Sequence, residues 1–230
     1  LESTYAKGAK QIMSTVASAL SVQRVEELCD ALMKADMLCH EDVSLACGLC
    51  QCLNSMLLKH PRAVAHANSK GIFSRALELY SRVMPASLSA EWWAGACTEI
   101  DVTTSRLTGV WILFNQIKRL EGATASAWWP QLLDASIQMV QMNSVAGLSG
   151  RDTVSFFPVV LPAAMVEVAA QDEAYRTLLL ASNVVEALEY GILHDFSCVG
   201  LSMSAYAADA AVALVGRQEG RWTLSREAVF

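Results

Sequence analysis

The stretch "ACGLCQCLNSMLLKHPRAVAHANSKGIFSRALELY", residues 46–80, decides the fold class of this chain. Its apolar residues recur at spacings of three and four, which is the period of one face of an α-helix. Pro61 and the turn-forming residues of "NSKG" at 68–71 interrupt this period, because proline starts a helix more readily than it continues one. The stretch therefore predicts three consecutive helices, near 42–59, 62–68 and 71–84.

The same period continues along the rest of the chain, and runs of alternating β-branched residues are rare. Turn-forming residues at "MPAS" (84–87), "EGAT" (121–124) and "GLSGRD" (147–152) separate further helices. We therefore expect an all-α protein. The remaining helices are expected near 3–19, 22–37, 88–98, 102–121, 125–143, 152–170, 173–181, 184–194 and 196–216.

The composition is that of a folded domain with a large core. Of the 230 residues, 53% are hydrophobic and 17% are charged, which excludes a disordered chain. So low a charged fraction suggests that another molecule covers part of the apolar surface. The net charge is −6, and the excess acid lies in residues 84–230. A nucleic-acid binder needs a basic face for the phosphates, so that class is disfavoured.

The sequence also bears on location. It has no window of eighteen uncharged apolar residues, so we expect no transmembrane span. The seven cysteines follow no regular framework, which favours reduced thiols in the cytoplasm or another reducing compartment. The start at Leu1 and the helix-like opening "TLSREAVF" at 223–230 suggest a fragment of a longer protein.

One pattern returns four times: a long helix with a large apolar anchor, a polar break, then one or two shorter helices. The anchors are separated by 61, 54 and 46 residues, and they are Leu53, Phe114, Val168 and Leu214. The segments "DEAYRTLLLASNVVEALEYGILHD" (172–195) and "SAYAADAAVALVG" (204–216) resemble an armadillo repeat, and "HPRAVAHANSKGIFSRALELY" (60–80) is similar.

The resemblance to armadillo and HEAT proteins implies a right-handed superhelical solenoid, and the alternative is an irregular helical bundle. It implies one helical-repeat domain over 1–230, with an N-terminal helical pair at 1–40 and three to four irregular repeats at 42–230. It also implies a non-enzymatic scaffold or adaptor that binds a protein partner and needs no cofactor.

In such an array the last helix of each unit would line the concave face, where it could hold an extended peptide. Those helices are expected near 71–84, 125–143 and 184–194. The side chains that they offer to a partner are Arg75, Glu78, Trp129, Gln138, Gln141, Asn143, Glu186, Glu189 and Tyr190. Glu186 and Glu189 would favour a basic segment. The alternative is that these residues form a solvated face.

Two tryptophan pairs stand in "EWW" (91–93) and "AWWP" (127–130). Adjacent residues on a helix point about 100° apart, so one indole of each pair can enter the core while the other leans toward the surface. An exposed tryptophan is a frequent binding hot spot. The alternative is that both indoles wedge between helices.

Cys47, Cys50 and Cys52 could form a metal site with Cys39 or His40. On a helix, however, Cys50 and Cys52 point about 200° apart, so all three thiols cannot face one ion. When the first copy of the repeat is shifted by 161 residues, the three cysteines fall on Ala208, Ala211 and Ala213. We therefore interpret them as small core residues and predict no metal.

The sequence offers little support for catalysis. His194 and Cys198 have the residue types of a thiol catalyst, but no phosphate loop, HExxH or GxSxG motif is present. We predict that the protein is not an enzyme. Two alternatives remain: a structural subunit of a large assembly, which the low charge favours, and a helical enzyme or metal protein built on the Cys47 to Cys52 region or on His194 and Cys198.

Overall fold

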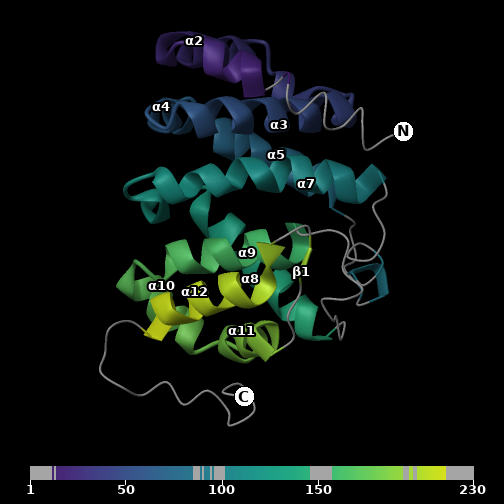
Figure 1. The fold of residues 1–230 in the computed structure, drawn as a ribbon, viewed down its shortest axis with the longest axis vertical. Helices are drawn as coiled ribbons and strands as arrows, with labels where there is room; N and C mark the ends of the chain where they lie inside the picture. Colours follow the sequence, from purple (N-terminus) through teal and green to yellow (C-terminus); the bar gives the residue numbers. More distant parts are fainter. Residues whose placement is uncertain are drawn as a thin grey trace. The chain divides into compact units, whose positions relative to one another are not determined.

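The chain is all-α, as the period of its apolar residues predicts (Figure 1). A computed structural model describes residues 12, 14–84, 89, 91–93, 95, 102–145, 157–193, 197–198 and 201–215. The chain divides into two compact units, one of residues 1–84 with 106–123 and one of residues 85–105 with 124–230. We take each unit by itself.

The first unit consists of short helices around an apolar core. Its first described helical residues are 12 and 14–19. Its further elements are α2 (Val22–Lys34), the 3₁₀ helix η1 (Met37–Cys39), α3 (Val43–Lys59), α4 (Ala63–Ser69), α5 (Ile72–Val83), most of α7 (Val102–Phe114) and the 3₁₀ helix η2 (Asn115–Arg119). α2 packs on α4 and η1, and α5 packs on α3 and α4. Within this unit, α3 lies between α2 and α7 (Figure 1).

Local chemistry explains the ends of the helices in the first unit. The Asp42 carboxylate accepts hydrogen bonds from the amides of Ser44 (2.9 Å) and Leu45 (3.1 Å) and so caps the start of α3. Gly71 has a φ of 84°, a left-handed conformation that glycine adopts without steric cost, and it turns the chain from α4 into α5.

Two helices of the first unit end earlier than the sequence predicts. α2 stops at Lys34 rather than near 37, because Asp36 adopts a left-handed φ of 50° and the chain continues as η1. The helix expected over 102–121 is α-helical only to Phe114 and tightens into 3₁₀ geometry over η2. Such tightening is common in the last turn of a helix.

The second unit is built around five packed helices. Besides helical residues 91–93 and 95, its described elements are α8 (Trp129–Val145), α9 (Phe157–Ala169), α10 (Glu173–Leu180), α11 (Val184–Leu193), β1 (Ser197–Cys198), β2 (Leu201–Ser202) and α12 (Met203–Val215). The 3₁₀ helix η3 (Ala123–Ala125) spans the border between the units. α8 packs on α9 and α11, α12 packs on α9 and α11, and α10 contacts α9, α11 and α12.

The helix expected from residue 196 begins only at Met203. The residues before it pair as a two-residue antiparallel ladder, Ser197 with Ser202 and Cys198 with Leu201. Of the helix expected over 88–98, residues 91–93 and 95 are helical, and the others lie outside the described residues. None of the described helices is both long and apolar enough to cross a membrane.

Candidate functional site

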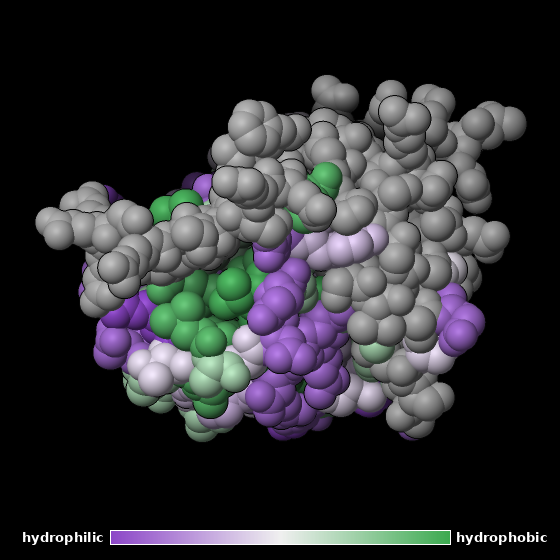
Figure 2. Space-filling view, turned by 90° about the horizontal axis from the view of Figure 1, so that it is seen from below, coloured by the Kyte–Doolittle hydropathy of each residue, from purple (hydrophilic) through white to green (hydrophobic). Residues whose placement is uncertain are grey.

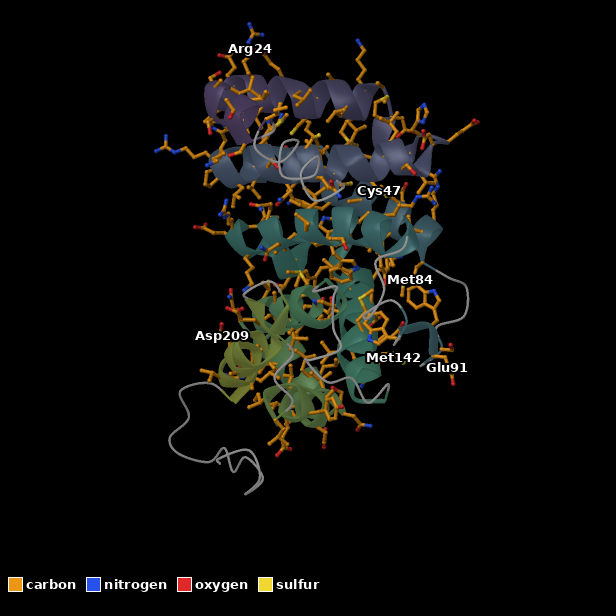
Figure 3. All side chains as sticks on the ribbon, turned by 45° about the vertical axis from the view of Figure 1, so that its right-hand side comes forward. Arg24, Cys47, Met84, Glu91, Met142 and Asp209 are labelled. Carbon is orange, nitrogen blue, oxygen red and sulfur yellow. The ribbon has the colours of Figure 1, made fainter. Side chains whose placement is uncertain are left out.

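α3 and the α7–η2 segment contact each other at a constant separation in the sequence. Hydrogen bonds join residues 62 positions apart: Arg106 Nη2 to Ser44 Oγ (2.8 Å), Gln116 Nε2 to Asn54 Oδ1 (2.6 Å) and Arg119 Nη1 to the Leu57 carbonyl (3.3 Å). Arg119 Nη1 also lies 3.3 Å from the Leu58 carbonyl, 61 positions away. Because the separation stays at 61 to 62 along the helix, the two segments run in the same direction and in register. Figure 3 shows Cys47 between α3 and α7, whereas Arg24 points outward from α2.

Gly109 marks the closest approach of α7 to α3. A β-carbon at this position would lie 2.9 Å from the Cys47 carbonyl oxygen and 3.2 Å from Gln51 Nε2. Only a residue without a side chain allows the two helices to approach this closely.

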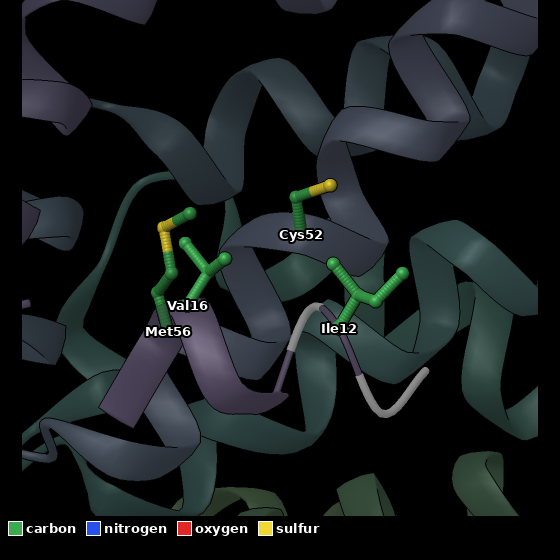
Figure 4. A pocket seen from close by; sticks show the side chains of 4 residues that line it. All are labelled: Ile12, Val16, Cys52 and Met56. Atoms are coloured by element: carbon green, nitrogen blue, oxygen red, sulfur yellow. The ribbon is translucent and has the colours of Figure 1, made fainter. Parts of the chain in front are cut away.

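The first helical segment lies beside α3 in a similar way. His60 Nε2 lies 2.8 Å from the Ala17 carbonyl oxygen. Pairs of residues 40 positions apart line a shallow pocket of about 150 Å³ between the two helices (Figure 4), and its walls are the side chains of Ile12, Val16, Cys52 and Met56. This pocket was not predicted from the sequence, where its only signal is the four-residue spacing of the apolar residues on both helices.

The two residues of the candidate site in the first unit bind each other. Arg75 Nη1 lies 2.6 Å from Glu78 Oε2, and Arg75 Nε lies 3.6 Å from Asp36 Oδ1. Cys39 Sγ approaches the same Glu78 oxygen at 3.6 Å. The hydrogen bond to Glu78, with the nearby acidic groups, raises the pKa of Arg75. Both side chains are partly exposed, so a partner would have to compete with this ion pair.

The two tryptophan pairs each combine a buried indole with a half-buried one. Trp93 and Trp129 are 0% exposed, whereas Trp92 and Trp128 are half-buried. The Trp129 ring packs edge-on against Tyr175 at 6.3 Å. Trp129, expected to face a partner, is therefore a core residue of the second unit, because its indole fills the space beside α10.

The other candidate residues lie on α8 and α11, which pack side by side. Gln138 and Glu186 are exposed, and Gln141, Glu189 and Tyr190 are half-buried. Burial raises the pKa of the Tyr190 phenol. The backbone of Asn143 belongs to α8, but its side chain lies outside the described part of the chain.

Asp134 lies on the same face of α8 as Gln138, although it is not among the residues selected from the sequence. It is exposed and precedes Gln138 by four residues, one turn of α8. With Asp134, Glu186 and Glu189, these two helices carry three carboxylates, and their described residues carry no lysine or arginine. We call this set of side chains the α8–α11 face: Asp134, Gln138, Gln141, Glu186, Glu189 and Tyr190.

The three cysteines of α3 differ in their surroundings. Cys47 and Cys50 are buried in the first unit, and Cys52 lines the pocket beside Met56. Burial raises the pKa of Cys47 to about 11 and that of Cys50 further. In the parts of the chain that the structure describes, no three His, Cys, Asp or Glu side chains are grouped so that they could hold a metal ion. His194 and the Cys198 side chain lie outside those parts.

Eight large apolar side chains are exposed in the described residues: Ile12, Val16, Leu45, Leu58, Leu178, Leu180, Leu193 and Val212. Figure 2 shows a hydrophobic area bordered by hydrophilic residues on one face of the molecule. Single exposed apolar residues are common in soluble proteins. Ile12 and Val16 differ, because they meet in one pocket.

No protein-family model matches the chain, and comparisons with curated proteins and with solved structures find no match. The geometry of the two units therefore carries the functional argument alone.

Proposed function

We propose that this protein is a non-enzymatic scaffold built as an armadillo- or HEAT-like right-handed solenoid, and that its α8–α11 face binds a basic segment of a partner protein. The observation that carries the solenoid is the register between α3 and α7. In a repeat array, equivalent helices of successive units stack in parallel, so a constant sequence separation between contacting residues is expected.

The contact separation of 61 to 62 agrees with the spacing of the repeat pattern. The first two anchors, Leu53 and Phe114, are 61 residues apart, and both are buried. The last two anchors, Val168 and Leu214, are also buried. Burial of all four supports their interpretation as equivalent core positions of successive units.

The helices of the second compact unit also support a repeat array. α9 spans Phe157–Ala169 and α12 spans Met203–Val215, so their corresponding ends are 46 residues apart. The two helices have equal lengths and pack against each other. α8 and α11, which precede them, also pack against each other. Equivalent helices of successive repeats that pack on each other are typical of a repeat array.

The charge of the α8–α11 face points to the chemistry of the partner. Its carboxylates, Asp134, Glu186 and Glu189, attract lysine and arginine, and the amides of Gln138 and Gln141 can donate to a peptide carbonyl. Complementary charge mainly speeds association and selects the partner. A basic, extended protein segment is therefore the partner that we expect.

The test uses a fluorescein-labelled peptide of alternating lysine and alanine and measures its anisotropy with the full chain. Wild type should bind the peptide, and the affinity should fall as salt is raised, because the charges lie at the surface. The Glu186→Lys, Glu189→Lys double variant should lose at least about tenfold in affinity.

The matched control is Glu26→Lys, Glu27→Lys on α2, which makes the same change in net charge in the first unit. An equal loss of affinity in this control would mean that only the total charge matters. Failure of wild type to bind, or a salt-independent affinity, would also contradict the assignment of the face. If the assignment holds, affinity capture from cells with wild type and both double variants identifies the partner. It is the protein that wild type and the control retain and that Glu186→Lys, Glu189→Lys loses.

A second candidate function is that of a structural subunit in a large assembly. The aliphatic side chains of Ile12 and Val212, which are 66% and 65% exposed, favour this function.

We also propose that the protein resides in the cytoplasm or another reducing compartment. The five described cysteines, all free thiols, support this location.

A further inference from the structure

Two positions of α12 are exposed where their counterparts on α9 are buried. Val212 and Asp209 of α12 are exposed, Val212 at 65%. The positions 46 residues earlier are Val166 and Ala163 of α9, and both are 0% exposed. α9 has α12 packed against it. α12 thus exposes an apolar position whose counterpart on α9 is buried.

The pocket of the first unit offers a matching cavity. Ile12 is 66% exposed and Val16 is 48% exposed, although both line it together with Cys52 and Met56. Apart from the Cys52 thiol, a weak donor, none of these side chains can donate or accept a hydrogen bond. A charged or polar group would lose its hydration there without compensation. An aliphatic side chain fits the chemistry, and a volume of about 150 Å³ is large enough for one.

We infer that two copies of this chain associate head to tail, with α12 of one copy lying on the first helical segment and α3 of the next and with Val212 filling the pocket. The inference rests on the stacked helices of the proposed solenoid. A second copy is the occupant because this contact continues the α9–α12 interface. The same chain also carries both an open apolar side chain and an open apolar pocket.

Such a contact joins different surfaces of the two copies. Each copy keeps a free Val212 or a free pocket after the first contact, so association continues beyond a dimer. The size distribution is therefore diagnostic, because a contact between identical surfaces would stop at two copies.

Sedimentation velocity over a range of concentrations up to about 100 µM tests this inference. Wild type should form species larger than a dimer as its concentration rises. Val212→Arg and Val16→Asp should each be monomeric, because each leaves a charge against an apolar surface. A mixture of the two variants should form a 1:1 dimer and stop there, because one intact half of the contact remains on each.

The matched control is Leu58→Arg, which changes an aliphatic side chain of α3 that is 49% exposed and does not line the pocket. It should assemble as wild type does. A second measurement does not depend on loss of assembly: Val212→Cys should form an intermolecular disulfide with Cys52 when oxidised glutathione is added, and Cys52→Ala should abolish it.

A wild-type chain that stays monomeric, or assembly that survives Val212→Arg, would overturn the inference. So would a mixture of the variants that does not associate. None of these outcomes involves Glu186 or Glu189, and the basic peptide can be measured with monomeric Val212→Arg, so failure of this inference and failure of the proposed partner binding are distinguishable.

Discussion

At the scale of single residues, Gly109 sets the distance between α3 and α7. A β-carbon there would approach the Cys47 carbonyl oxygen to 2.9 Å, and a backbone atom inside a helix cannot move away cheaply. Alanine would gain about 1 kcal/mol of helix propensity, but the overlap should cost about 1 to 3 kcal/mol. We expect Gly109→Ala to lower the free energy of unfolding, as measured by urea denaturation.

Gly48 provides the control for this experiment. It lies inside α3, and a β-carbon there would meet no atom within 4 Å. Gly48→Ala should therefore stabilise the protein by about 0.5 to 1 kcal/mol. If both substitutions changed stability in the same direction, close approach of the two helices would not be the reason for Gly109.

The cysteine thiols should differ in reactivity. Cys39 and Cys52 are partly exposed, whereas Cys29, Cys47 and Cys50 are buried. Burial raises the pKa of all five thiols, and that of the three buried ones to about 11 or above. Because the thiolate is the reactive form, iodoacetamide at neutral pH should modify the first two well before the others. Mass spectrometry of peptides over time measures the order, and rapid labelling of Cys50 would contradict its burial.

At the scale of secondary structure, the Asp42 cap fixes the start of α3. Its carboxylate accepts from the Ser44 and Leu45 amides, two donors that the helix itself leaves without partners. Asp42→Ala should lower the free energy of unfolding by about 0.5 to 2 kcal/mol. Asp42→Ser should recover most of it, and Glu41→Ala, which removes a neighbouring carboxylate outside the cap, should have little effect. Urea denaturation of the three variants measures these changes, and an equal loss in Asp42→Ala and Glu41→Ala would contradict the capping role of Asp42.

The helices themselves were largely predictable, because capping, proline and glycine act within one or two turns. α3, α4, α5, α10 and α11 end within a residue or so of the predicted bounds. The exceptions have different causes. Asp36 takes its left-handed φ beside Arg75, a residue far along the chain. The β1–β2 pair, which joins residues three and five positions apart, replaces the expected start of α12.

At the scale of the whole molecule, stability should fall at alkaline pH. Folding raises the pKa of Cys29 and Cys47 from 9.0 to about 11, and burial also raises that of Cys50 and Tyr80. The folded state therefore keeps protons that the unfolded chain loses. This contribution is complete below pH 9 and is lost as the pH rises toward 11.

Thermal midpoints between pH 7 and 11 measure this effect. In the triple variant Cys29→Ala, Cys47→Ala, Cys50→Ala, the decrease above pH 9 should be smaller than in wild type, because three of the four groups no longer titrate. An equal decrease in both proteins would assign it to other groups. The same variant tests the interpretation of the cysteines as small core residues, since Cys50 corresponds to Ala211 in the last copy of the repeat.

The candidate site was predictable only in part. Helical spacing placed Gln138, Glu186 and Glu189 on surfaces of α8 and α11, and these two helices do pack together. The same spacing allowed one indole of each pair to face outward, but the choice of Trp129 as the outward one was wrong, because Trp129 is buried and Trp128 is half-buried. Which of these two indoles faces the core depends on Tyr175, 46 residues after Trp129, whose ring packs against it.

The sequence by itself determined the helical class and most helix ends, because these follow from hydrogen bonds and apolar spacing within a few residues. Tertiary structure alone decided the register of α7 on α3, the burial of Trp129 and the pocket at Ile12 and Cys52. Each of these joins residues that lie 40 to 62 positions apart. Their contact depends on how closely whole helices approach, and no local pattern in the chain specifies that distance.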